Sequence, residues 1–340
     1  MCSWFRNAML PPFAIAWPHD PPQFIQLYQH NAAAVAQELL QGLSAPQAFT
    51  SPKYLYDALG SRLFEAITEL PEYDLTRTEA QLMRLHSADM ALHMPAGACW
   101  IDLGAGNCEK AGRMLGPLQA GRYVAVDISV DFVRQALDSL QRQHPDLAMA
   151  GLGTDFSSGL ELPDALGLDS AQARVLFYPG SSIGNFTPDQ ALGFLQSLHR
   201  ACGTAMGSGL LIGVDLLKDA AELEAAYDDA LGVTAAFDLN LLLHINRLVG
   251  SNFVVRDWRH LSRFNAEQSR VEMHLQARHA VQVQWPGGER LFAAGETIHT
   301  ENACKWTLPN FEALLHAAGF AQTRAWTDPA QRFAVLWATA

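Results

Sequence analysis

Two glycines and a carboxylate stand where an α/β protein can bind a nucleoside. The apolar segment 98–103 ends at Gly104-Ala105-Gly106, and the apolar segment 123–126 ends at Asp127. Glycines let the backbone approach a ligand closely, and an acid at the second strand tip can accept hydrogen bonds from both ribose hydroxyls. The turn lacks the third glycine of the dinucleotide pattern, which argues against a NAD-dependent dehydrogenase. The pattern favours a ligand without a pyrophosphate, such as S-adenosyl-L-methionine.

Three further residues are candidates for the same cofactor site. Asp155 and Phe156 follow the third expected strand, where the carboxylate can accept from the adenine amino group and the Phe156 amide can meet the ring. Lys110 lies one turn into the helix after the glycines, within reach of a methionine carboxylate. Taken singly, Asp155 reads equally well as a helix cap, and Lys110 better as a solvated helix lysine.

A glycine-rich loop with an asparagine follows the fourth expected strand. The sequence of segment 180–185 is Gly-Ser-Ser-Ile-Gly-Asn. Its glycines allow close backbone approach, and the Asn185 carboxamide can face a polar substrate group, although Asn185 is also a common turn residue. Ser181 and Ser182 lack a nucleophile elbow. No metal site is expected, because the histidines lack the spacing of a zinc or iron site; they include His244, His260, His274, His279 and His299.

The elements that must position these residues alternate between strands and helices, which predicts a parallel, doubly wound α/β sheet. Strands are expected at 99–103, 122–127, 149–154, 173–179 and 208–215, with helices at 107–117, 129–144 and 187–202. A helix at 308–318 and antiparallel strands at 321–327 and 332–338 would close the sheet. This order is that of a class I methyltransferase (Rossmann-like) sheet.

Two regions fall outside this alternation. Residues 1–30 are Pro-rich and aperiodic, and helices are expected at 31–43, at 54–70, and from a capping box of Thr76 and Glu79 to about 93. Helices at 218–231 and 234–249 precede strand-like stretches at 271–284 and 289–292. We expect residues 1–77 and 216–304 to form an inserted α+β substrate-binding lobe, and residues 78–215 and 305–340 to form the methyltransferase core.

Charge and composition narrow the partners. The 340-residue chain has a formal net charge of −12 and no Lys/Arg cluster, which argues against nucleic acid and anionic membrane surfaces. No stretch of the chain is apolar enough to span a membrane, and Pro11-Pro12 interrupts the apolar start, so no secretory signal is expected. Five scattered cysteines without a CxxC pair indicate reduced thiols. We expect a cytoplasmic monomer that acts on a small molecule.

Several motifs, in order, resemble the ergothioneine-pathway L-histidine Nα-methyltransferases. The similarity covers roughly residues 45–340, and its motifs lie at 53–61, 70–73, 76–81, 102–106, 180–185, 226–237 and 301–305. The resemblance implies S-adenosyl-L-methionine as the methyl donor and Nα,Nα,Nα-trimethylhistidine as the product. The chemistry then consists mainly of placing a neutral amine in line with the activated methyl group and excluding water.

The resemblance also implies roles for four polar residues. Asn185 and Tyr227 match residues that hold the substrate α-carboxylate. Tyr56 and Tyr73 match pocket tyrosines near the α-amine and the imidazole, and Tyr56, or a water beside it, would accept the amine proton. Considered alone, each tyrosine fits an interior aromatic residue better than a substrate-binding residue.

Three more positions bear on the choice of amino acid. Met273 matches an apolar pocket wall, and Glu301 matches an acid that contacts the imidazole. Ala303 stands where the family has a serine, so one hydroxyl partner of the imidazole is missing. The same reaction on another amino acid or on a histidine derivative, such as tryptophan or a thiolated histidine, therefore stays open, as does a non-catalytic nucleotide-binding module on this fold.

Overall fold

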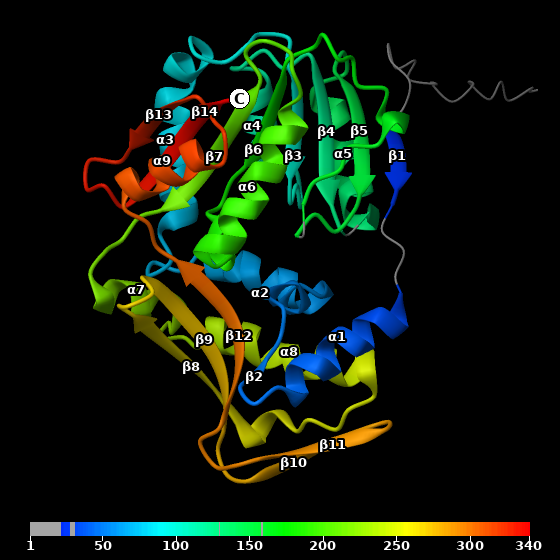
Figure 1. Cartoon of the computed structure of the whole chain (residues 1–340), viewed down its shortest axis with the longest axis vertical. Coiled ribbons are helices and arrows are strands. Elements are labelled where there is room, and N and C mark those ends of the chain that lie inside the picture. Colours follow the sequence, from blue (N-terminus) through cyan, green and yellow to red (C-terminus); the bar gives the residue numbers. More distant parts are fainter. Residues whose placement is uncertain (1–21, 28–30, 129, 158) are drawn as a thin grey trace, which may run out of the picture.

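The computed structural model describes residues 22–27, 31–128, 130–157 and 159–340. Its larger sheet has eight strands in the order β1-β5-β4-β3-β6-β7-β14-β13 (Figure 1). In that order the strands are β1 (Gln23–Gln26), β5 (Ala148–Gly153), β4 (Arg122–Asp127), β3 (Cys99–Leu103), β6 (Arg174–Tyr178), β7 (Gly209–Asp215), β14 (Phe333–Thr339) and β13 (Gln322–Thr327).

The pairing of these strands confirms the predicted fold class. Neighbouring strands from β1 to β7 are parallel, whereas β14 runs antiparallel to both β7 and β13. The ligand side of such a sheet is the edge where the parallel strands end. The glycine turn after β3, Asp127 at the end of β4 and segment 180–185 after β6 therefore meet at one edge.

Helices cover both faces of the larger sheet, so its central strands are apolar on both sides. Within β3, Trp100 packs in one hydrophobic cluster, and Cys99 and Ile101 pack in the cluster on the opposite face. Phe177 and Leu176 of β6 divide in the same way. The covering helices are α3 (Leu75–Ala91), α4 (Glu109–Leu115), α5 (Val130–Gln143), α6 (Pro188–Cys202) and α9 (Leu308–Ala317).

The start of α6 was predicted correctly, whereas the capping box predicted at the start of α3 is wrong. Thr187 caps α6 through a reciprocal capping box with Gln190, and Pro188 occupies the first turn, as expected. The capping box expected at Thr76 and Glu79 is wrong, because α3 begins after Asp74 without a side-chain cap. Glu79 is buried, and its carboxylate bonds to groups outside its own helix.

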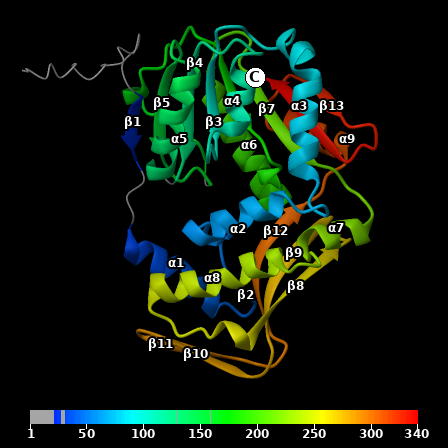
Figure 2. The same ribbon diagram turned by 180° about the vertical axis from the view of Figure 1, so that it is seen from behind.

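A second body, the lobe, lies beneath the ligand edge in Figure 1. Its α8 packs against α2, α1 and the 3-10 turn Pro52–Leu55 (Figure 2). A four-stranded sheet, in the order β2-β12-β9-β8, and the hairpin β10-β11 complete it. The lobe elements are α1 (Ala32–Ser44), α2 (Ala58–Thr68), α7 (Ala220–Tyr227), α8 (Val233–Val249), β2 (Ala48–Phe49), β8 (Trp258–Asn265), β9 (Arg270–Ala277), β10 (Val281–Trp285), β11 (Gly288–Phe292) and β12 (Thr297–Cys304).

Residues 23–26 correct the expectation that all of 1–77 belongs to the lobe, because β1 pairs with β5 at the edge of the larger sheet. Gly151 leaves room for Phe24, whose ring atoms would lie 2.7 Å from a Cβ at that position. The Arg134 guanidinium lies 4.0 Å from the centroid of the same ring. Residues 1–21 and 28–30 of the expected arm lie outside the described residues.

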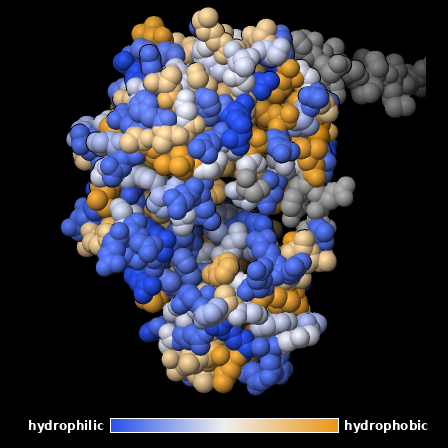
Figure 3. Space-filling view, viewed as in Figure 1, coloured by the Kyte–Doolittle hydropathy of each residue, from blue (hydrophilic) through white to orange (hydrophobic). Residues whose placement is uncertain are grey.

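The surface combines polar and hydrophobic side chains. On the face shown in Figure 3, hydrophobic residues occur in small groups among hydrophilic ones. Within the described part of the chain, no helix is long and apolar enough to cross a membrane.

Candidate active site

A cavity lies where the ligand edge of the larger sheet meets the lobe. Segment 180–185 contributes to it from the sheet, and α2, α7, α8, β9 and β12 contribute from the lobe. The structure brings all seven predicted substrate residues to this cavity: Tyr56, Tyr73, Asn185, Tyr227, Met273, Glu301 and Ala303. Their placement agrees with one substrate site, whereas their individual roles stay predictions.

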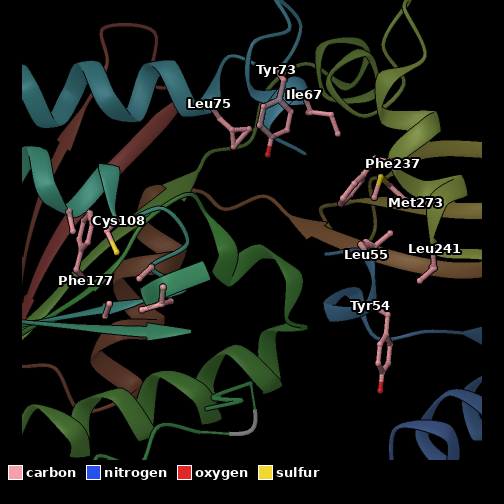
Figure 4. Close-up of a cluster of buried hydrophobic side chains, with 14 of the residues drawn as sticks. Tyr54, Leu55, Ile67, Tyr73, Leu75, Cys108, Phe177, Phe237, Leu241 and Met273 are labelled. Carbon is pink, nitrogen blue, oxygen red and sulfur yellow. The ribbon is translucent and has the colours of Figure 1, made fainter. Parts of the chain in front are cut away.

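Aromatic side chains form much of the cavity wall. The Tyr56 ring centroid lies 5.5 Å from that of Phe64 and 5.4 Å from that of Phe237, both in edge-to-face geometry. Tyr73 and Tyr227 pack in the same geometry at 6.0 Å. Figure 4 shows Tyr73 with Phe237 and Met273, which come from α8 and β9. Such packing fixes the rings and leaves the tyrosine hydroxyls to orient a polar ligand.

The cavity tyrosines are neutral phenols at ordinary pH. Burial raises the pKa of the Tyr56 hydroxyl well above its usual value, and the nearby Glu301 adds to the effect. Burial and Tyr227 do the same for the pKa of Tyr73, and burial and Asp215 for the pKa of Tyr227. A neutral phenol can accept a hydrogen bond from an amine, but it cannot take up the proton that the amine loses. The structure therefore disfavours Tyr56 as the final proton acceptor.

Glu301 is the acid in the cavity wall. It lies on β12 directly after a register shift that begins at His299, and opposite Met273 of β9. Irregularities of this kind redirect side chains at functional sites. Burial raises the Glu301 pKa to about 8, helped by the charge of Asp238 and opposed by Lys305 and a hydrogen bond with Asn185. At neutral pH this carboxyl can therefore donate or accept a hydrogen bond.

Sequence reasoning assigned no role to a buried lysine in the same wall. Lys305 Nζ lies 2.9 Å from the Tyr227 hydroxyl and 2.7 Å from Asp215 Oδ2. Burial alone would raise the Asp215 pKa, but Lys305 and Lys218 outweigh it and hold the pKa low. Lys305 thus brings a positive charge to the cavity. The sequence feature that could have indicated Lys305 is its position at the end of motif 301–305, which carries the family resemblance.

The cofactor turn has the backbone that a close ligand approach requires. Gly104 and Gly106 have φ values of 72° and 52°, a region that favours glycine. The Asp127 carboxylate accepts a hydrogen bond from the Gly106 amide at 3.0 Å, so the turn and the acid form one unit. Phe156 lies against the turn, since a Cβ on Gly104 would meet its ring at 3.8 Å.

The other two cofactor candidates make contacts that the sequence did not reveal. Asp155 accepts from the amide and hydroxyl of Ser157 at 3.0 and 2.6 Å, and it pairs with Lys53 at 3.3 Å. Lys110 pairs with Glu79 at 2.8 Å, and the second Glu79 oxygen accepts from the Gly180 amide at 2.7 Å. Glu79 therefore links the helix after the cofactor turn to the loop of the substrate cavity.

These residues fit S-adenosyl-L-methionine. Gly104 and Gly106 provide an open backbone turn, Asp127 an acceptor at the neighbouring strand tip, and Asp155 with Phe156 a polar and an aromatic contact at the next strand. Within the described residues, no group of three or more His, Cys, Asp or Glu side chains could hold a metal ion. The sheet order and this row of residues define a class I S-adenosylmethionine-dependent methyltransferase.

Comparison with known proteins makes the assignment specific. The chain belongs to the family described as "Histidine-specific methyltransferase, SAM-dependent", whose model matches residues 35–340. It is similar to the histidine N-alpha-methyltransferase of Mycolicibacterium smegmatis, with 38% identity over 308 residues that cover 89% of this chain and 94% of that protein. These findings confirm the family resemblance, the methyl donor and the enzyme class.

Two further similarities are more distant. The ergothioneine biosynthesis protein 1 of Neurospora crassa is 32% identical over 282 residues, which cover 80% of this chain and 31% of that protein. Among solved structures, the Burkholderia thailandensis 1,6-didemethyltoxoflavin-N1-methyltransferase, with bound 1,6-didemethyltoxoflavin and S-adenosylhomocysteine, is 16% identical with a TM-score of 0.43. That match covers 87% of this chain and 93% of that one.

Proposed function

We propose that this protein transfers methyl groups from S-adenosyl-L-methionine to the α-amine of L-histidine. The observation that carries the proposal is the cavity between the sheet edge and the lobe, which gathers Asn185, Tyr227 and Glu301. The cofactor turn follows β3 at the same edge of the sheet. The relatives named for histidine methylation support the same substrate. We extend the proposal to ergothioneine biosynthesis, the process for which the Neurospora crassa relative is named.

The α-carboxylate and the imidazole of the amino acid would contact different residues of the cavity. Tyr227 and Asn185 would hold the α-carboxylate, with the Lys305 ammonium behind Tyr227. Glu301 would meet the imidazole, Met273 would pack against the apolar part of the ring, and Tyr73 would complete the wall. Because Asn185 hydrogen-bonds Glu301 in the structure, a bound substrate would enter or replace that contact.

Catalysis would depend on position more than on acid–base strength. When bound, the cofactor supplies a methyl group already activated by its sulfonium. The chain would orient the neutral amine through Tyr56 and exclude bulk water with Phe64 and Phe237. Because the pKa of the Tyr56 hydroxyl is raised well above its usual value, the amine proton would pass to water and not to Tyr56. Neutral tyrosines near the amine would tolerate added methyl groups, in keeping with three successive transfers.

A second candidate is the same reaction on another amino acid or histidine derivative. Ala303 favours it, because this residue lies in a small apolar cluster with Leu223 and Val271 and supplies no hydroxyl. Tandem mass spectrometry of the histidine product tests the proposal. Methyl groups located on the α-nitrogen support it, whereas methyl groups on the ring nitrogens contradict it.

Three organisational points are part of the proposal. Residues 31–77 and 216–304 form the substrate-binding lobe, and 78–215 with 305–340 form the core, to which β1 adds an edge strand. The protein is a cytoplasmic monomer. Cys99, Cys108, Cys202 and Cys304 are buried free thiols, in keeping with a reducing compartment.

A further inference from the structure

A buried histidine behind the cavity wall holds the backbone of Tyr227. His260 lies on β8, and its Nε2 is 2.8 Å from the Tyr227 carbonyl oxygen. Its Nδ1 is 2.7 Å from Asp238 Oδ2, on α8. The side chains are 1% and 0% exposed, so neither group exchanges these contacts for water.

The partners of His260 determine its protonation. A carbonyl oxygen can only accept, so Nε2 must carry a proton. An ionised Asp238 then requires a second proton on Nδ1, which makes the ring an imidazolium. Burial would lower the His260 pKa, but the hydrogen bond and charge of Asp238 outweigh it and raise the pKa. The raised pKa favours the imidazolium, in which both ring nitrogens donate, Nε2 to Tyr227 and Nδ1 to Asp238.

Tyr227 is held at both ends by these contacts. It is the last residue of α7, where a helix leaves its carbonyl groups without partners inside the helix. His260 binds that carbonyl, while Lys305 donates to the hydroxyl at the other end of the residue. Asp238 follows Phe237, another residue of the cavity wall, so the pair connects α7, α8 and β8.

We propose that His260 and Asp238 are positioning residues of the amino-acid site, which fix Tyr227 for the substrate carboxylate without touching the substrate. This inference rests on the proposed function. Asp238 Oδ1 is buried and has no hydrogen-bond partner among the described residues, which is costly. Replacement of a buried ion pair by apolar residues is often neutral or stabilising, so fold stability alone is a weak reason for this pair. Positioning of Tyr227 gives the charged pair another role.

Four variants test the proposal. His260→Phe removes both bonds, and we expect the histidine KM to rise about tenfold or more, the worth of one to two hydrogen bonds. His260→Gln retains a donor that can reach the Tyr227 carbonyl, and it should restore much of the loss. Asp238→Asn can donate to Nδ1 while Nε2–H still donates to Tyr227, so it should restore much of the loss that Asp238→Leu shows. Asp238→Leu should resemble His260→Phe.

A control histidine away from the cavity and a second ligand separate positioning from general damage. His316 on α9 makes a similar contact, Nδ1 to the Phe320 carbonyl at 3.0 Å, and His316→Phe should leave the histidine KM unchanged. The S-adenosylhomocysteine Kd of every variant should stay near wild type. If His260→Phe does not fold, the histidine KM values of Asp238→Leu and His260→Gln test the proposal.

Two results would overturn the inference. One is an unchanged histidine KM in folded His260→Phe or Asp238→Leu. The other is an equal loss of histidine and S-adenosylhomocysteine binding, which would indicate a structural role. Failure of the proposed function looks different, because the wild-type protein itself would then leave histidine unmethylated.

Discussion

The ammonium nitrogen of Lys305 lies 2.9 Å from the hydroxyl oxygen of Tyr227. Because the ammonium can only donate, it occupies a lone pair of that oxygen and leaves the hydroxyl hydrogen free for an acceptor in the cavity. A substrate carboxylate is such an acceptor, and the buried positive charge favours it further. The contact thus turns Tyr227 into a directed donor.

Replacement of Lys305 should therefore weaken amino-acid binding selectively. We expect Lys305→Met to raise the histidine KM by about tenfold or more, since a hydrogen bond to a charged group contributes about 1.5–3 kcal/mol. Lys218→Met is the matched control, because Lys218 also pairs with Asp215 at 2.7 Å but does not line the cavity. Equal KM values in the two variants would contradict the role of Lys305.

The carboxylate contacts can be tested from the substrate side. Asn185→Ala and Tyr227→Phe should each raise the histidine KM several-fold, and histidinamide should be a poor substrate of the wild-type protein. Tyr178→Phe is a control, because Tyr178 is buried but does not line the cavity. Methylation of histidinamide at the rate of histidine would show that the cavity does not bind a carboxylate.

The raised pKa of Glu301 predicts an effect on stability with a definite sign. Its value of about 8 lies above the ordinary 4.5, so the folded state holds the proton more tightly than the unfolded chain does. That stabilisation is complete below about pH 4.5 and is lost as the pH rises through 8. Glu301→Gln copies the neutral form. Its Tm should exceed that of wild type increasingly from pH 5 to pH 8, by roughly 2 °C per kcal/mol.

Glu296 provides the opposite case in the same lobe. Burial would raise its pKa, but the Ala293 amide and Arg290 outweigh burial and lower the pKa. Its stabilisation is present above the ordinary glutamate pKa and is lost in acid, so Glu296→Gln should lower the Tm at pH 8. Thermal unfolding over this pH range checks both variants. A Glu301→Gln protein that is less stable than wild type at pH 8 would refute the raised pKa of Glu301.

Most of the larger sheet could be predicted because its signals are local. Apolar runs end in glycine or a carboxylate at β3 and β4, and Thr187-Pro188 marks the start of α6. The strand β1 could not be predicted in this way. It has four residues, and it pairs where Gly151, distant in sequence, leaves space for Phe24.

The site was predicted in part for the same reason. Six of the seven substrate residues came from ordered motifs, and Met273, which lies outside those motifs, came from the same family resemblance. The contacts between the seven depend on chain segments that only the fold brings together. Glu79 fits a capping box locally, yet Lys110 and the Gly180 amide determine where its carboxylate lies. His260 carried no local signal at all, because its partners are on α7 and α8.

Cofactor binding should depend on Asp127. Asp127→Ala removes the acceptor for the ribose hydroxyls and for the Gly106 amide, so we expect a loss of roughly 2–4 kcal/mol in S-adenosylhomocysteine affinity. Asp127→Asn keeps an acceptor without the charge, so its S-adenosylhomocysteine affinity should fall between those of wild type and Asp127→Ala. Calorimetry measures both. Wild-type affinity in a folded Asp127→Ala protein would show that this carboxylate does not bind the nucleoside.

Ala303 tests the choice of amino acid. Ala303→Ser restores the hydroxyl that the family has at this position. It should leave histidine activity equal or improved, by no more than about 1.5 kcal/mol, the net worth of one neutral hydrogen bond. The kcat/KM ratio for histidine is the measurement. A strong loss would mean that Ala303 makes space for a different substrate, with the methyl-transfer chemistry retained.

The central claim is that this cavity selects histidine for methylation at its α-amine. The most direct measurement offers all twenty amino acids, one at a time, with an isotope-labelled methyl donor and follows the products by mass spectrometry. We predict that histidine is the preferred substrate and accumulates up to three labelled methyl groups. Preference for another amino acid, with histidine left unmodified, would contradict the account.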